Sequence, residues 1–208
     1  MPLIIRPETP ADYHAAEHVT QKAFWNLHNP GCNEHYLVHK LRTDPAYLPE
    51  LSRVAELDGA VVGTIMYSRA HVVAGDVTRD VLIFGPLAVD PAFQKTGIGA
   101  QLMQTTFQLA RDAGHKAIII FGEPGYYPRF GFVPCDRFGI TTADGQNFDA
   151  FMALELVPGA LAGVHGAFHY APVFEDLPDA EVDEFSKRFP PLEKLRLPGQ
   201  WGYEEETK

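Results

Sequence analysis

The chain has 208 residues, of which 46% are hydrophobic, and its formal net charge at pH 7 is −10. This length and apolar content suffice for one sizeable core. The acidic balance argues against nonspecific nucleic-acid binding, which needs Lys and Arg to neutralise phosphates. No apolar run approaches the roughly 18 residues that span a membrane, and the N-terminus lacks the basic start of a secretion signal. With two distant cysteines, the composition predicts a reduced, cytoplasmic protein.

The hydrophobic pattern predicts strands and helices in a regular order over the first 121 residues. Strands are expected at 3–6, 53–57, 61–67, 81–89 and 117–121, and helices at 10–24, 34–41 and 98–113. Thr9 and Asn33 are typical helix N-caps, and Gly114 is a typical helix stop. Asp58-Gly59 predicts the turn of a hairpin, and residues 74–76 predict a further turn.

The composition changes after Pro158, which predicts a C-terminal extension of residues 158–208 behind a core of residues 1–157. Residues 159–163 read as a connector, and residues 167–170 as one more strand. From Phe174 onward prolines and acids dominate, ending in Glu204, Glu205 and Glu206. We expect an extended segment there, lying across the core or across a second subunit in a homodimer.

The most informative motif is Gln94-Lys95-Thr96-Gly97-Ile98-Gly99-Ala100, which joins an apolar strand to a helix. The first turn of a helix has backbone N–H groups without partners, and the helix dipole adds partial positive charge there. Gly97 and Gly99 lack a Cβ, so a phosphate can approach those N–H groups. The motif therefore predicts a phosphorylated ligand, and the alternative is a tight turn with no ligand.

Two common phosphate-binding patterns do not fit these residues. A dinucleotide fold of the G-x-G-x-x-G/A type requires a small residue where Leu102 stands. A P-loop requires a Gly-Lys-Ser/Thr triplet, which the sequence lacks. The pattern Gln/Arg-x-x-Gly-x-Gly/Ala does fit, with Gln94, Gly97, Gly99 and Ala100 in register.

A second motif, Tyr127-x-x-x-Gly131-Phe132, follows the predicted strand at 117–121. With the glycine motif, it makes about three quarters of the chain resemble the GCN5-related N-acetyltransferases (GNAT), especially their YhbS-like branch. The resemblance implies an α/β (α+β) fold, with a mixed, strongly bent sheet and helices on both faces. It also implies that acetyl-CoA, as co-substrate, gives its acetyl group to a primary amine by direct attack in a ternary complex.

The resemblance further implies roles for particular residues. In the family, the glycine motif binds the pyrophosphate of acetyl-CoA, which assigns that group to residues 94–100. The preceding strand binds the pantetheine arm, which assigns the arm to the backbone of Leu87, Ala88 and Val89. Tyr127 would protonate the departing thiolate, or else only pack beneath the cofactor, as is expected of Tyr126. Pro128 directly after Tyr127 departs from the family pattern and leaves the hydroxyl position open.

The acceptor amine must lose a proton before it can attack a thioester. Candidate bases are Glu34, His35, His39 and Glu123, but no motif selects one of them. Each also has a structural interpretation. An acid at position 34 suits a helix start, Glu123 suits a solvated loop, and the histidines suit packing or solvent. Glu34 is our first choice. The acceptor is expected to be a small-molecule amine, a peptide N-terminus or a lysine.

The spacing Cys32-x-x-His35-x-x-x-His39 raises a zinc hypothesis, because the two histidines are one helical turn apart. A fourth ligand with suitable spacing is missing, so we expect no metal. Cys135 has no adjacent base and is not expected to be a nucleophile. Two rival functions remain. One is a catalytically silent acyl-CoA-binding or regulatory module, and the other is a zinc-dependent hydrolase that uses the two histidines.

Overall fold

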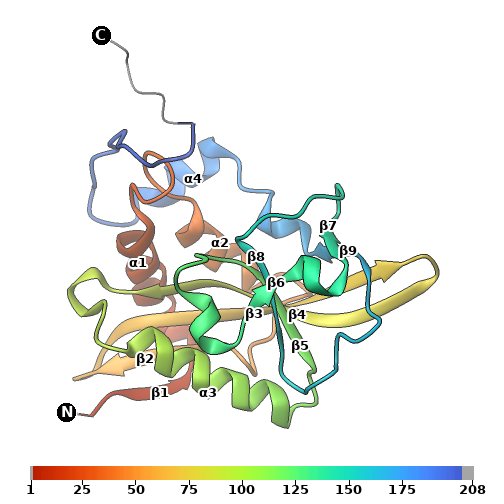
Figure 1. Cartoon of the computed structure of the whole chain (residues 1–208). Helices are drawn as coiled ribbons and strands as arrows, with labels where there is room; N and C mark the ends of the chain where they lie inside the picture. The colour runs from red at the N-terminus through yellow and green to blue at the C-terminus, as the bar shows by residue number, and fades with distance from the viewer. Residues whose placement is uncertain (1, 203–208) are drawn as a thin grey trace.

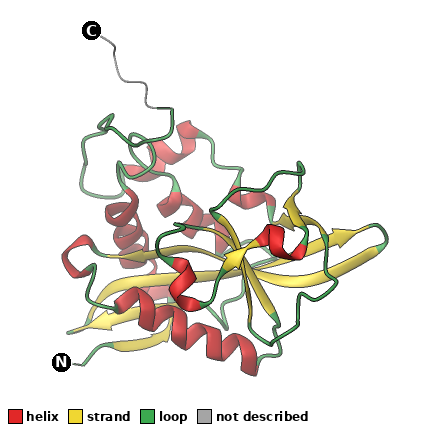
Figure 2. Cartoon of the chain, in the orientation of Figure 1, coloured by secondary structure: helices red, strands yellow, loops and turns green. Residues whose placement is uncertain are grey.

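The computed structural model describes residues 2–202, so Glu204, Glu205 and Glu206 lie outside the described residues. It has a central sheet with helices around it (Figures 1 and 2). The helices are α1 (Tyr13–Phe24), α2 (Glu34–Leu41), α3 (Ile98–Asp112) and α4 (Asp179–Ser186). The strands are β1 (Ile4–Pro7), β2 (Arg53–Leu57), β3 (Ala60–Ala74), β4 (Val77–Val89), β5 (Ala117–Phe121), β6 (Val133–Pro134), β7 (Ile140–Thr142), β8 (Phe151–Glu155) and β9 (Gly166–Tyr170). Within residues 2–202, no helix has the length and apolar character needed to cross a bilayer.

The strands and helices predicted over the first 121 residues are confirmed to within one residue at their ends, apart from two larger differences. The predicted helix at 10–24 begins as a separate 3-10 turn, η1 (Pro10–Asp12), before α1. β3 and β4 are longer than predicted, because they stay paired up to the turn at residues 75–76. β9 additionally pairs with the outer part of β3, from Ala70 to Val73. In Figure 1 this long hairpin projects away from the helices.

The sheet is mixed, as predicted. Its strands follow the order β1-β2-β3-β4-β5-β8-β6, and β9 pairs with both β3 and β7. The β4–β5 and β7–β9 pairs are parallel, whereas the other pairs are antiparallel. A strand from the predicted C-terminal extension therefore belongs to the same sheet as the predicted core.

Helices cover both faces of the sheet, as two neighbouring residues of β3 show. Successive residues of a strand point to opposite faces, and these two pack against different helices. Tyr67 is fully buried and packs in one cluster with Leu102 of α3. Its hydroxyl lies 2.9 Å from Thr106 Oγ1, also in α3. Its neighbour Met66 packs in a different cluster, with Leu41 of α2. The α3 face and the α2 face are thus separated by the sheet.

β4 and β5 diverge toward their C-terminal ends. Within the described residues, the two strands are in register at Leu82 and Ile118 alone. β4 also contains a bulge, since Phe84 stands opposite Tyr67 whereas Leu87 stands opposite Ile65. Two β4 residues therefore oppose one β3 residue. Beyond the bulge, no strand of the described part of the chain pairs with the β4 edge that faces β5.

The C-terminal segment differs from the predicted extended chain, because it contains α4. Asp179 and Glu181 stand in the first turn of α4, where acids favour a helix. Val182 and Phe185, three residues apart, supply its buried face. The residues after α4 then reach the loop between α1 and α2, where the Trp201 backbone N–H donates to His28 O at 2.9 Å. Figure 1 shows this segment beside α1 and α2.

Candidate functional site

The N-terminus of α3 presents its free N–H groups to open space. Gly97 is the N-cap and has a φ of 91°, in the left-handed region that favours glycine. A Cβ built on Gly97 would meet no atom within 4 Å. Lys95 also has a positive φ, of 63°, which costs an L-residue about 1 kcal/mol or more. This strained turn leaves Lys95 exposed beside the helix dipole.

Side chains of the same motif hold this turn in place. The Gln94 Nε2 amide donates a hydrogen bond to Val89 O at 3.1 Å, and Thr96 Oγ1 donates to Phe93 O at 2.6 Å. Phe93 belongs to the short 3-10 turn η2 (Pro91–Phe93) between β4 and α3. Gln94 therefore ties the turn to the end of β4. This local contact was not expected from the motif.

The free edge of β4 carries backbone groups of Leu87 and Val89. The Asp90 N–H donates to Val62 O at 2.9 Å, so this pair is a hydrogen-bonded pair of the antiparallel ladder. Hydrogen-bonded and non-bonded pairs alternate along such a ladder. The pairs made by Leu87 and Val89 with β3 are consequently non-bonded, and their N–H and C=O groups point away from β3. Ala88 lies between them, and its side chain is buried.

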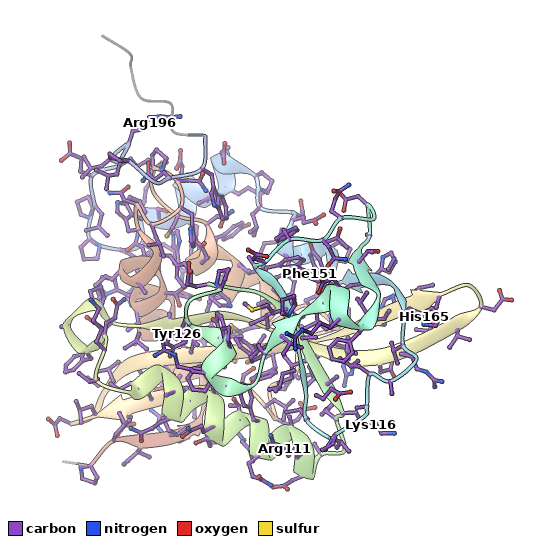
Figure 3. The ribbon with its side chains drawn as sticks, viewed as in Figure 1. Arg111, Lys116, Tyr126, Phe151, His165 and Arg196 are labelled. Carbon is purple, nitrogen blue, oxygen red and sulfur yellow. The ribbon has the colours of Figure 1, made fainter. Side chains whose placement is uncertain are left out.

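Tyr126 and Tyr127 stand at the start of the 3-10 turn η3 (Tyr127–Phe130), directly after the divergence of β4 and β5. The Tyr126 hydroxyl lies 3.4 Å from the position that a Cβ on Gly99 would take, so it sits over the first turn of α3. Figure 3 shows Tyr126 near this end of α3. Tyr127 packs between Phe84 of β4 and Phe132, with ring centroids 6.0 and 5.6 Å away. The two sequence motifs thus meet in space.

The environment of Tyr127 keeps its phenol protonated. Burial, and to a smaller degree the neighbouring Tyr126, raises the pKa of Tyr127 well above its ordinary value. Among the residues that the structure describes, no side chain or backbone group is hydrogen-bonded to the Tyr127 hydroxyl. The hydroxyl is therefore free to donate to another molecule. Pro128, which departs from the family pattern, is accommodated as the second residue of η3.

Gly122 lies under the Tyr127 ring and lets it pack there. A Cβ on Gly122 would overlap Cε2 and Cδ2 of that ring and would lie 3.1 Å from Ile120 Cδ1. Gly122 belongs to neither sequence motif, although a glycine between a buried strand and a Tyr-Tyr pair is a detectable signal. The close approach makes Gly122 part of the structure that positions Tyr127.

We expect Gly122→Ala to lower the free energy of unfolding by about 1–3 kcal/mol, because the new methyl group overpacks the Tyr127 ring. Urea denaturation measures the change. Gly125→Ala is the matched control, since its Cβ would meet a single group, Glu123 Oε1, at 3.5 Å. Equal stability of the two variants would contradict the assigned packing.

The acetyltransferase (GNAT) family model matches residues 20–132. This span is more than half of the chain, and it contains the α3 N-terminus, the β4 edge and Tyr127. The chain belongs to the GNAT acetyltransferase family.

Several GNAT proteins resemble this one over most of their length. YhbS of Escherichia coli, solved in complex with CoA, superimposes with a TM-score of 0.74 at 27% identity, covering 85% of this chain and 93% of YhbS. A GNAT acetyltransferase of Brucella melitensis, in complex with acetyl-CoA, gives 0.66 at 31% identity, covering 83% and 98%. The uncharacterized N-acetyltransferase YjhQ of Escherichia coli K12 is 37% identical over 100 residues, which are 48% of this chain. That match spans 55% of YjhQ.

Two carboxylates of this GNAT protein were candidate bases, and both have local partners. Glu34 begins α2, and its Oε2 accepts a hydrogen bond from the Asn33 N–H at 3.1 Å, as a helix-start acid does. Burial raises the pKa of Glu34. Glu123 is exposed, and its Oε1 accepts from the Gly125 N–H at 3.1 Å, which shapes the loop before Tyr126.

The two histidines face different partners. His35 is fully buried, with Nε2 at 2.8 Å from Ser186 Oγ and Nδ1 at 3.3 Å from Cys32 Sγ. His39 Nδ1 instead lies 3.0 Å from Glu17 Oε1. Over residues 2–202, no group of three or more His, Cys, Asp or Glu side chains is arranged to hold a metal ion. The geometry therefore gives the zinc hypothesis no support.

We expect the buried His35 to make stability depend on pH. Burial lowers the pKa of His35 from 6.5 to about 4. Between these values the unfolded chain binds a proton that the folded chain does not, so the free energy of unfolding falls as pH falls. His35→Gln should flatten this decline by an amount on the order of 2 kcal/mol, measured by urea denaturation at pH 7 and pH 4.5. An unchanged pH dependence in the variant would contradict a neutral, buried His35.

Neither cysteine has the character of a nucleophile. Cys135 is fully buried, and burial raises the pKa of its thiol to about 12. Burial likewise raises the pKa of Cys32, with a smaller contribution from Glu34. Both thiols therefore stay protonated at neutral pH, whereas the thiolate is the reactive form.

Proposed function

We propose that this GNAT protein transfers an acetyl group from acetyl-CoA to a primary amine by direct attack within a ternary complex. One observation carries the proposal: the α3 N-terminus, the β4 edge and Tyr127 lie together. The Tyr126 hydroxyl lies over the first turn of α3, and the adjacent Tyr127 ring packs on Phe84 of β4 and on Gly122 after β5. Each of these three features suits a different part of acetyl-CoA. The relatives solved with CoA and with acetyl-CoA support the same choice of donor.

The donor would bind through backbone groups more than through side chains. Residues 94–100 would take the pyrophosphate, with the N–H groups of the first α3 turn and the Lys95 charge as its partners. The outward N–H and C=O groups of Leu87 and Val89 would bind the amide groups of the pantetheine arm as an added strand would. The Gln94 amide already donates to Val89 O. The pantetheine arm would therefore either displace the Gln94 amide from this carbonyl or bind without using the carbonyl.

The chemical step would follow from this placement. A base first takes one proton from the ammonium group of the acceptor. The neutral amine nitrogen then attacks the thioester carbonyl carbon and forms the new C–N bond while the carbonyl oxygen takes up negative charge. The C=O bond re-forms as the C–S bond breaks, the sulfur receives a proton from the Tyr127 hydroxyl, and the nitrogen releases its second proton to solvent. Holding the two reactants together supplies much of the rate enhancement. Solvent restores the tyrosine proton after CoA leaves.

Glu34 is our proposal for the base. Its raised pKa moves it toward neutral pH, where a carboxylate can accept a proton more effectively. Glu34→Gln should then lower kcat/KM and remove an acidic limb from the pH profile. If Glu34→Gln keeps the pH profile of the parent protein, Glu34 only stabilises the start of α2, and water removes the proton from the amine.

The proposal is tested with a panel of amines, following release of the CoA thiol, alongside calorimetric titration with CoA. We expect turnover with at least one class of primary amine. Tight CoA binding without turnover on small amines, peptide N-termini or lysine peptides would overturn the proposal in favour of a catalytically silent acyl-CoA-binding module. The free thiols of Cys32 and Cys135 fit the reducing cytoplasm, where we place the reaction.

A further inference from the structure

A cluster of aromatic side chains lies at the end of β5, on the sheet face opposite α3. We call it the aromatic cluster; its members are Phe121, Phe148, Phe151, Phe168, Tyr170 and Phe174. Phe121 is at its centre, with ring centroids 5.2 Å from Phe151, 5.6 Å from Tyr170 and 6.0 Å from Phe148. Figure 3 labels Phe151, at the start of β8.

The aromatic cluster has a buried part in the core and an exposed part at the surface. Phe151 and Phe168 are fully buried and already fill the interior. Phe121 and Phe148 stack on each other and yet remain 41% and 48% exposed. Two adjacent, exposed aromatic rings leave apolar surface in water, which is costly unless a ligand covers it.

The cluster borders the site of the proposed reaction from the side opposite Tyr127. Phe121 and Gly122 are consecutive, and Gly122 touches the Tyr127 ring. Phe121 packs with the cluster on one face, whereas Ile120 packs with Tyr127 on the α3 face. Phe174 reaches the β4 bulge, where its Cε1 lies 3.9 Å from the position of a Cβ on Gly85. A molecule on these rings therefore stands across the β4–β5 divergence from the donor.

The charge beside the cluster is negative. Glu175 Oε1 accepts a hydrogen bond from the Tyr170 hydroxyl at 2.5 Å. Burial, that hydrogen bond, and the charges of Glu175 and Asp144 together raise the pKa of Tyr170. Carboxylates and aromatic faces both attract a cation, and both disfavour a second carboxylate. The formal charge of −10 acts in the same direction over longer range.

We propose that the acceptor is an arylalkylamine, a cationic amine that carries an aromatic group and no carboxylate. Its ring packs on Phe121 and Phe148, and its ammonium group passes Tyr170 and Glu175 to reach the β4 bulge. This inference rests on the proposed function and names its substrate class. Phe121 and Phe148 are then specificity-determining residues, and Glu175 excludes amino acids.

The test compares 2-phenylethylamine with two probes that each differ from it in one feature. Phenylalanine adds a carboxylate to the same skeleton, and ethylamine removes the ring. We expect kcat/KM for 2-phenylethylamine to exceed both by tenfold or more. A preference for phenylalanine, for a polyamine or for a peptide N-terminus would overturn the inference while leaving acetyl transfer intact.

Variants test whether the aromatic cluster causes the preference for 2-phenylethylamine. Phe148→Ala should raise the KM for 2-phenylethylamine about tenfold and leave the KM for acetyl-CoA unchanged. Glu175→Gln should narrow the discrimination against phenylalanine. Val157→Ala is the control, because Val157 is equally exposed, at 46%, but follows the opposite end of β8. An unchanged amine KM in Phe148→Ala would overturn the inference.

A binding measurement separates this inference from the proposed function. Calorimetry with the CoA-loaded protein should detect 2-phenylethylamine, and Phe148→Ala should weaken it about tenfold. Binding without turnover on any amine would refute acetyl transfer but keep the aromatic site. Turnover on other amines without this binding would refute the aromatic site alone.

Discussion

Tyr127→Phe should lower kcat about 10²- to 10³-fold while changing the Kd for CoA less than about threefold. The variant removes one hydroxyl, and the ring keeps its packing between Phe84 and Phe132. Without the hydroxyl, the thiolate must leave unprotonated from a partly buried position, and the transition state loses a donor aimed at its charge. Steady-state turnover and calorimetric titration with CoA measure the two quantities.

Tyr126→Phe is the matched control, since the two tyrosines are adjacent and their rings lie 5.2 Å apart. The Tyr126 hydroxyl sits over Gly99, so its loss should alter acetyl-CoA binding more than kcat. Because burial raises the pKa of Tyr127, the acid stays protonated as pH rises. The parent kcat should accordingly show no loss from this group between pH 7 and about 10. If Tyr127→Phe keeps the parental kcat, Tyr127 is not the acid and its ring only packs beneath the cofactor.

Gly97→Ala should weaken CoA binding 10- to 100-fold. The open space beside Gly97 means that the added methyl group meets no protein atom. Any loss beyond backbone strain therefore reports a ligand that occupies this space. The strain itself, from a φ of 91°, should lower the free energy of unfolding by about 1–2 kcal/mol.

Gly114→Ala separates the two effects. Gly114 follows the other end of α3, has a φ of 85°, and likewise has nothing within 4 Å of an added Cβ. The 15 residues of α3 place it about 22 Å from Gly97. We expect the same loss of stability and an unchanged Kd for CoA. Equal weakening of CoA binding by both substitutions would contradict binding of the pyrophosphate at the α3 N-terminus.

The sequence predicted best where local signals mark both ends of an element. β5 has the predicted bounds because Gly122 follows its apolar run and Gly114 ends the preceding helix. β6 and β7 were not predicted, since strands of two and three residues are too short to show a pattern. β8 was missed although it is as long as β5. α4 was missed because the flanking prolines outweighed the spacing of Val182 and Phe185.

In the candidate site, too, local sequence signals could be predicted and contacts made by folding could not. The glycine motif and the Tyr127 motif could be found from spacing, and the structure brings them together. The hydrogen-bond partners of individual side chains could not be found that way. His35, for example, faces Ser186, which is 151 residues away, and Gln94 turns its amide to Val89. The aromatic cluster also escaped prediction, because its rings come from β5, β8, β9 and the loops between them.

The pairing of β9 with the outer part of β3 has a practical consequence for shortened versions of the protein. A chain ended after residue 157 would lose β9 and uncover the edge of β3 from Ala70 to Val73. An uncovered strand edge is a template for pairing with other chains. Such a truncation should aggregate rather than yield a smaller enzyme. β9 therefore protects this edge of β3, so a shortened version of the protein should keep residues 166–170.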